Sequence, residues 1–174
     1  LPVTGDAWCW GSNSAGRLGD GTVVSRLAPV PVSGGVTFAS IVAGGTHTCG
    51  LTAAGAAYCW GLGLSGQLGD NSVVSKSAPS LVAGGFTFAS LAAGGNHTCG
   101  LTAAGTAYCW GLNSFGQIGD STSGAGTNRI VPTAVKGGFT FTQISAASAH
   151  TCGVATNGLP MQIIPREAAE LSTE

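Results

Sequence analysis

Charged side chains are scarce in this sequence of 174 residues. Six are basic and seven are acidic, so charged residues make up 7% of the chain, against a usual share of ~25%. The formal net charge of -1 excludes the basic surface with which nucleic-acid-binding domains attract phosphate groups. A disordered chain is excluded as well, because disorder goes with low hydrophobicity and high net charge, whereas 44% of these residues are hydrophobic.

Long regular patterns are also missing. Coiled coils and helical bundles need extended runs of Ala, Glu, Lys, Leu and Arg, which this chain does not have. Collagen needs glycine at every third position, whereas the 30 glycines here often fall in doublets. Polar residues and glycine interrupt every apolar stretch within ~18 residues, so no membrane-spanning helix is expected. These exclusions leave a glycine-rich and threonine-rich all-β protein.

The chain is organised as a repeat with a period of about 50 residues. Trp10, Trp60 and Trp110 occupy the same place in successive units, and cysteine, aspartate and histidine recur in the same way. After the repeat pattern ends, residues 159–174 gather acidic side chains, and we expect them to form a non-repeat tail that docks loosely. The repeats, residues 1–158, divide into 1–50, 51–100, 101–153 and the start of a further repeat at 154–158.

Each repeat contains short apolar segments separated by glycine-rich turns. In the middle of the chain the expected strands are 38–42, 47–52, 56–61 and 80–82. Short strands at even spacing are typical of β-propeller blades or of a β-solenoid, and four strands in about 50 residues match one blade. A coil of a parallel β-helix needs only three strands. The expected fold is therefore a partial β-propeller of about three four-stranded blades.

Four of the six cysteines face each other in predicted hairpins. A three-residue loop usually ends in glycine, and residues 53–55 fit that rule. The resulting register places Cys49 opposite Cys59, and the same register places Cys99 opposite Cys109. Directly opposed residues have Cβ atoms ~4.5–5.5 Å apart, which small adjustments bring to disulfide geometry. Two disulfides are predicted, and they indicate an oxidising compartment.

The remaining cysteines, Cys9 and Cys152, lie on single arms of incomplete hairpins, one near each end of the repeats. They are either unpaired or joined between chains. In the second case two copies arranged head to tail would form a closed six-bladed ring, with Cys9 of one chain opposite Cys152 of the other. A homodimer is therefore one expectation, and a single partial propeller is the other.

The unit His-Thr-Cys-Gly-Leu-Thr, followed by Ala-Tyr-Cys-Trp-Gly and then Gly-Gln-Leu-Gly-Asp, resembles the regulator of chromosome condensation repeat over residues 1–158. The resemblance implies a seven-bladed β-propeller, in which loops on one face bind other proteins. The second cysteine pair resembles the bacterial secreted branch of the family, which implies an extracellular or cell-surface location. Because the chain is too short for seven blades, the resemblance also implies a fragment of a larger secreted protein.

The repeated histidines and aspartates each allow two interpretations. His47, His97 and His150 lie two residues before a cysteine and could form a zinc set, but cysteines that already pair with each other favour a hydrogen-bonded structural role. The repeated aspartates, Asp20 among them, supply too few oxygens for calcium and favour turn capping. The repeated tryptophans are either an exposed array or packing between blades, and we favour packing. No metal or cofactor is expected.

No unique set of nucleophile, base and acid stands out, so no catalytic residue is assigned and an enzyme is not expected. The loops that differ between repeats are instead candidate protein-binding loops, since aromatic and arginine side chains often anchor interfaces. The alternative is that they are ordinary surface loops. The expected function is protein binding with an unidentified partner, and the alternatives are a purely structural array or an inhibitor that binds a secreted enzyme. The candidate loop residues are Asn13, Asn113, Phe115, Asn128 and Arg129.

Overall fold

The fold comes from a computed structural model that describes residues 5–156, so the predicted tail 159–174 lies outside the described residues. Within this range the only helical segment is the single turn η1, and no helix is long and apolar enough to cross a membrane. The elements are β1 (Trp8–Gly11), η1 (Ser14–Gly16), β2 (Arg26–Pro31), β3 (Ser40–Ala43), β4 (His47–Leu51), β5 (Ala57–Gly61), β6 (Lys76–Leu81), β7 (Ser90–Ala93), β8 (His97–Leu101), β9 (Ala107–Gly111), β10 (Arg129–Ala134), β11 (Phe141–Ala146) and β12 (Thr151–Ala155).

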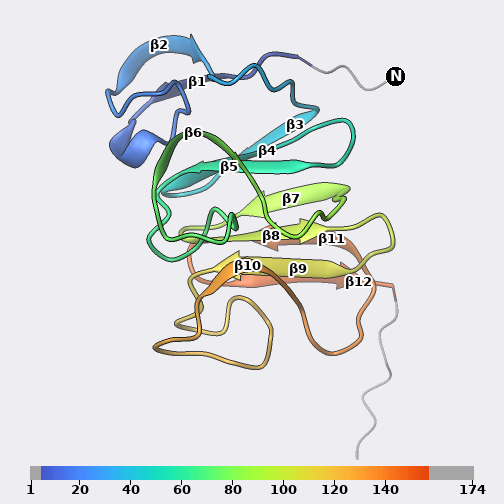
Figure 1. The fold of residues 1–174 in the computed structure, drawn as a ribbon. Coiled ribbons are helices and arrows are strands. Elements are labelled where there is room, and N and C mark those ends of the chain that lie inside the picture. Colours follow the sequence, from blue (N-terminus) through green and yellow to red (C-terminus); the bar gives the residue numbers. More distant parts are fainter. Residues whose placement is uncertain (1–4, 157–174) are drawn as a thin grey trace, which may run out of the picture.

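The strands form four antiparallel sheets stacked on one another (Figure 1). Strands β3 to β6 make one complete four-stranded blade and β7 to β10 make the next. Two-stranded sheets, β1–β2 and β11–β12, lie at the two ends of the stack. The predicted partial propeller is confirmed. Each complete blade takes its first two strands from one sequence repeat and its last two from the next, which is why half-blades flank the described stack.

The central hairpin of each blade has the predicted register. Cys49 pairs with Cys59, and the neighbouring pair joins Gly50 to Tyr58. A Cβ atom at Gly50 would overlap the ring of Phe38, which covers the strand at this point. Glycine is therefore required here by the close approach of an aromatic ring, and the same residue type occupies the equivalent place in β8.

Two strand boundaries differ from the sequence prediction. The first strand of the blade was expected at 38–42 but begins at Ser40, because Phe38 is a buried ring that packs on Gly50 rather than a strand residue. The fourth strand was expected at 80–82, after Pro79, but begins already at Lys76. Proline is tolerated inside this strand because β6 is the outer edge strand of its sheet.

Successive blades are held together by tryptophan side chains. Trp60 and Trp110 are fully buried, and each indole lies against a glycine in the loop of the preceding blade. A Cβ atom at Gly19 would lie 2.6 Å from Nε1 of Trp60, and one at Gly69 would lie 2.6 Å from Nε1 of Trp110. This confirms that the repeated tryptophans pack between blades. Trp10, at the end of the stack, is 62% exposed.

Candidate protein-interaction surface

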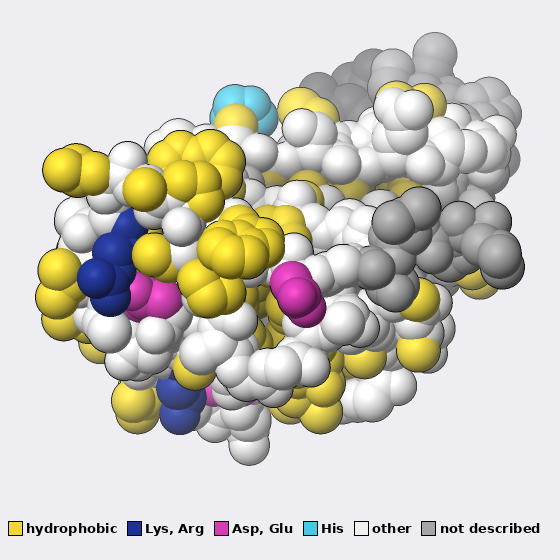
Figure 2. Space-filling view, turned by 90° about the horizontal axis from the view of Figure 1, so that it is seen from above, with side chains coloured by type: hydrophobic (Ala, Val, Ile, Leu, Met, Phe, Trp, Pro, Cys, Tyr) yellow, Lys and Arg dark blue, Asp and Glu magenta, His cyan; other side chains and the backbone are white. Residues whose placement is uncertain are grey.

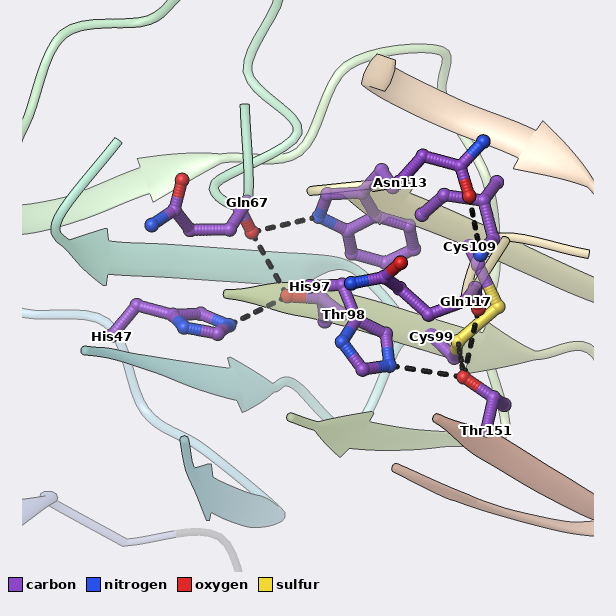
Figure 3. Close-up of a disulfide and its surroundings, with 11 residues drawn as sticks. His47, Gln67, His97, Thr98, Cys99, Cys109, Asn113, Gln117 and Thr151 are labelled. Atoms are coloured by element: carbon purple, nitrogen blue, oxygen red, sulfur yellow. Dashed lines mark hydrogen bonds between the residues drawn. A yellow bond between two sulfur atoms is a disulfide. The ribbon is translucent and has the colours of Figure 1, made fainter. Parts of the chain in front are cut away.

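A chain of polar contacts crosses the interface between the two complete blades and the interface between the second blade and the β11–β12 sheet (Figure 3). His47 at the start of β4 lies 2.7 Å from the Thr98 hydroxyl of the next blade, measured from Nε2 to Oγ1. That hydroxyl donates to the backbone oxygen of Gln67 over 2.9 Å. The next interface repeats the pattern with His97 and Thr151, whose Nε2 and Oγ1 atoms are 2.9 Å apart. His47 and His97 therefore form hydrogen bonds, as the structural interpretation predicted, whereas His150 is exposed.

The contacts fix the tautomer of each buried histidine. The single hydroxyl hydrogen of Thr98 is donated to Gln67, so Nε2 of His47 must carry the proton of the bond between them. Nδ1 of His47 and Nδ1 of His97 are then buried without a hydrogen-bond partner. Burial, reinforced by the charge of a neighbouring histidine, lowers the pKa of each imidazole to about 4. Both side chains are neutral at pH 7.

Aspartates organise the loops that connect the third and fourth strands. Asp20 accepts hydrogen bonds from the backbone N–H and the hydroxyl of Thr22, and from the amide of Asn13 over 3.1 Å. Arg26 adds an ion pair at 2.7 Å. Burial alone would raise the pKa of this carboxyl, but these donors outweigh it and lower the pKa of Asp20 to about 2. This is the turn-capping role that the sequence predicted.

The corresponding loop of the last complete blade repeats this arrangement. Asp120 accepts from Thr122 and Asn113, and Arg129 forms the ion pair. Burial would raise the pKa of the Asp120 carboxyl, but the donors around it hold that pKa below its usual range. Because Arg129 is committed to this carboxylate, the guanidinium is a structural group of the loop.

Three of the predicted binding residues make structural contacts within their loops. Asn13 and Asn113 are fully buried, and each side-chain oxygen accepts a backbone N–H five residues further along its own loop. Arg129 is half-buried in its ion pair. Asn128 is exposed, and its side-chain oxygen accepts the N–H of Asn113 over 3.1 Å. Phe115 alone is a large exposed side chain on a loop tip, with 77% of its surface accessible.

The loops carry further exposed apolar side chains that sequence reasoning missed. Loops 12–25, 62–75 and 112–128 lie on the same side of the stack, at the left in Figure 1. Exposed pairs of adjacent valines recur in the first two loops, and the second loop also exposes a leucine. The signal in the sequence was a Val-Val pair recurring between a turn aspartate and an edge strand, where no core needs it. We call this set the loop face; it comprises Val23, Val24, Leu64, Val73, Val74 and Phe115.

Four of the cysteines lie in buried pairs and two do not. Cys49 with Cys59, and Cys99 with Cys109, are fully buried and at disulfide distance, with Cα atoms 4.1 Å apart in both pairs. Cys9 and Cys152 are free thiols. Residues 5–156 contain no group of three or more His, Cys, Asp or Glu side chains that could hold a metal ion.

Removing one disulfide is expected to lower the free energy of unfolding by somewhat less than ~3 kcal/mol, the value for a 15-residue loop, because each bridge joins cysteines only 10 residues apart. Urea denaturation of the double variant Cys99→Ala/Cys109→Ala would measure the loss, with Cys152→Ala as the control for a free thiol. Non-reducing peptide mapping should recover both links. Free thiols at these four positions, in protein from an oxidising compartment, would contradict the pairing.

Stacked four-stranded antiparallel blades, with tryptophan and histidine side chains in contact across the interfaces between sheets, are the architecture of a β-propeller. Two sequence-family models, both described as Regulator of chromosome condensation (RCC1) repeat, match the chain. The chain therefore belongs to the regulator of chromosome condensation repeat family. A comparison with curated protein sequences found no match. One family model matches residues 4–51, 54–101 and 104–154, and the other matches 38–67 and 88–117.

Solved structures with the same fold include Prp20p from Saccharomyces cerevisiae, described with its binding properties to Gsp1p and histones, at a TM-score of 0.73 and 22% identity over 88% of this chain. Yeast RCC1 (Prp20), solved with Kap60 bound, has a TM-score of 0.75 and 26% sequence identity over 88% of this chain. Human WBSCR16 has a TM-score of 0.75 and 21% sequence identity over 86% of this chain. The matched regions cover 40%, 38% and 40% of those chains, so this chain spans well under half of their length.

Proposed function

We propose that the chain is a non-enzymatic protein-binding module that docks its partner on the loop face. The observation that carries the proposal is the set of exposed apolar side chains on successive loops of one side of the stack. Phe115 and Leu64 are 77% and 68% exposed, and neither is needed for the turns that the aspartates organise. Exposed apolar groups gathered on one face are typical of protein-interaction sites.

Three further points support the proposal. The structural neighbours Prp20p and yeast RCC1 are described with protein partners, and a shared fold makes protein binding a reasonable function for this chain. The two buried cysteine pairs fit a secreted protein, in an extracellular or cell-surface setting of a bacterium. The short span relative to the neighbours fits a fragment of a larger repeat protein. A homodimer would use the ends of the stack, where Phe115 of the loop face also lines the cavity beside Cys152.

Affinity capture tests this proposal. The chain would be immobilised and exposed to extracellular proteins, and each captured protein would then be identified and measured for direct binding. Leu64→Ser and Phe115→Ser should each weaken that binding by about tenfold or more, because central apolar anchors contribute most of the affinity. Leu81→Ser, which removes a similarly exposed apolar side chain from an outer strand, is the matched control and should change binding less than twofold.

The alternatives give different results in the same experiment. Binding that is insensitive to both loop variants would contradict the loop face as the docking site, and the absence of any direct binder would favour a purely structural array. A captured hydrolase whose activity falls on titration with the chain would identify the inhibitor class. Turnover of a substrate by the chain itself would contradict the non-enzymatic assignment.

A further inference from the structure

The first residue of each outer strand is a cation, but in the middle unit it lacks a carboxylate partner. Arg26, Lys76 and Arg129 are equivalent, because each pairs with the glycine that ends the neighbouring strand. Arg26 and Arg129 each form an ion pair with the aspartate of their own loop. Within residues 5–156, Lys76 forms neither an ion pair nor a side-chain hydrogen bond.

Serine hydroxyls leave this lysine unpaired. Asp70, the aspartate of the middle loop, accepts hydrogen bonds from the hydroxyls of Ser72 over 2.8 Å and Ser80 over 2.9 Å. Ser80 donates to Oδ2, the carboxylate oxygen to which the arginine donates in the other two units. The carboxylate is therefore satisfied without Lys76, and the ammonium group is left for a group from outside the chain.

A second cation replaces a neutral residue in the first loop. Gln67 and Gln117 are buried, and each side-chain oxygen accepts the backbone N–H of the residue two positions earlier in its loop. Arg17 occupies the equivalent position and is half-buried. Its Nε donates to the backbone oxygen of Ser14 over 3.1 Å, and its Nη1 donates to that of Gly45 over 2.9 Å. Both acceptors are neutral, so no carboxylate balances the guanidinium charge.

The unpaired lysine lies between the two loops that carry the exposed valines. A Cβ atom at Gly16 would lie 2.5 Å from Cα of Ser77, and a backbone hydrogen bond of 2.8 Å also joins the two segments. Loop 12–25 therefore rests on the start of β6, directly beside Lys76. Loop 62–75 leads into the same lysine along the chain. A positive charge is thus placed between two sets of exposed apolar side chains.

The carboxylates on this side of the stack are held inside their loops. The aspartates of the first and last loops have side chains that are only 6% and 4% exposed, and that of the middle loop is half-buried. Asp6, the other acidic residue among residues 5–156, precedes β1 and lies at the end of that strand away from the loops. At the left edge of the stack in Figure 2, the side on which the loops lie, Lys and Arg side chains are surrounded by hydrophobic ones.

We propose that the partner docks an acidic segment with apolar side chains on the loop face. Its carboxylates lie beside Lys76 and Arg17, and its apolar groups contact the valine pairs. The inference rests on the proposed protein-binding function and specifies the chemistry of the partner. Charge complementarity favours this occupant, because unpaired cations among apolar side chains attract an acidic surface and repel a basic one.

The two kinds of contact have different effects on binding. Burial of the apolar side chains supplies most of the affinity, as at other protein interfaces. The cations mainly select the partner and speed its association, because charges at the rim of an interface act on the association rate and on its salt dependence. Binding should therefore weaken as the salt concentration rises, since dissolved ions screen exposed charges.

Selection from a phage-displayed library of random peptides, on the immobilised 174-residue chain, tests the proposal. The enriched peptides should carry a net negative charge and combine aspartate or glutamate with leucine, isoleucine, valine or phenylalanine. Synthetic copies of these peptides would then be measured for direct binding at low and at physiological ionic strength. The affinity should be higher at low ionic strength.

Lysine variants locate the charged contact. Lys76→Gln should weaken peptide binding by about fivefold, the upper range for an exposed ion pair. Lys76→Glu should weaken it by about tenfold or more, because it places like charges opposite each other. Lys136→Glu changes an exposed lysine beyond the far end of β10, so it is the matched control and should change binding less than twofold.

A charge swap distinguishes a lost contact from a folding defect. A second peptide, with lysine in place of each acidic residue of the first, should bind the Lys76→Glu variant more tightly than it binds the unchanged chain. A variant that had lost its fold would bind neither peptide, and circular dichroism would show the loss directly.

Failure of this inference can be told apart from failure of the proposed function. Enriched peptides that lose affinity with Leu64→Ser but are neutral or basic, or that bind Lys76→Glu unchanged, would overturn the acidic partner and leave the loop face as a docking site. If no enriched peptide loses affinity with Leu64→Ser or Phe115→Ser, the docking site itself is refuted, and the acidic partner with it. Binding to phosphatidylglycerol vesicles that Lys76→Glu abolishes, with no acidic peptide enriched, would assign the surface to a membrane instead.

Discussion

Replacing Trp110 with alanine is expected to lower the free energy of unfolding by about 3–5 kcal/mol. The indole is fully buried, it packs against the loop glycine Gly69 of the preceding blade, and its N–H donates to the backbone oxygen of Gln67 over 3.0 Å. Alanine would leave a cavity between two blades and an unsatisfied carbonyl lone pair. A loss of this size is a large fraction of the ~5–15 kcal/mol that stabilises an ordinary domain.

The chain contains its own control for this experiment. Trp10 has the same repeat position but is 62% exposed, so Trp10→Ala should cost the dilute, reduced monomer less than about 1 kcal/mol. Urea denaturation followed by circular dichroism would measure both variants. If Trp110→Ala cost no more than Trp10→Ala, the packing of tryptophan between blades would not be what stabilises the stack.

Acidification between pH 6.5 and 4 is expected to destabilise the folded chain steeply. The pKa values of His47 and His97 are lowered from 6.5 to about 4 in the folded protein, chiefly by burial. The unfolded chain therefore binds protons first as the pH falls, so their stabilisation is complete above pH 6.5 and is lost as the pH approaches 4. Each histidine accounts for at most about 3 kcal/mol over this window.

Histidine variants test whether His47 and His97 cause this acid sensitivity. The unfolding free energy would be measured by urea denaturation at several pH values between 7 and 4. His97→Gln keeps a donor for Thr151 but does not titrate, so the slope of stability against pH should fall by about half. His150→Gln removes the neighbouring charge that helps to lower the pKa of His97, so it should reduce the slope by less than His97→Gln does. A slope that is equally steep in the double variant His47→Gln/His97→Gln would refute the assignment.

The parts of the fold that depend on local spacing were predictable from the sequence. The hairpin register followed from a three-residue loop ending in Gly55, and the structure has that register at both Cys49–Cys59 and Cys99–Cys109. The burial of Trp60 and Trp110 followed from their recurrence beside glycine. Both features arise within one repeat or between adjacent repeats, where sequence distance is a good guide to spatial distance.

The candidate site was less predictable, because the exposure of each side chain depends on how its loop folds back on itself. Asn13 and Asn113 look like solvent-facing loop residues in the sequence, but each loop folds back so that its amide bonds the carboxylate seven residues later. Arg129 is likewise drawn into an ion pair with Asp120. The exposed valine pairs were overlooked for the opposite reason, since an adjacent pair of valines is more often read as a strand than as a loop tip.

The contact between a loop glycine of one unit and a strand tryptophan of the next has a consequence for how such proteins gain repeats. At two interfaces a loop glycine of one unit contacts a strand tryptophan of the next, Gly19 with Trp60 and Gly69 with Trp110. A duplicated gene segment that encodes one repeat adds both a loop glycine and a strand tryptophan. The array therefore gains a unit without a new kind of interface having to arise. Stability then accumulates neighbour by neighbour, as in a one-dimensional chain of coupled units.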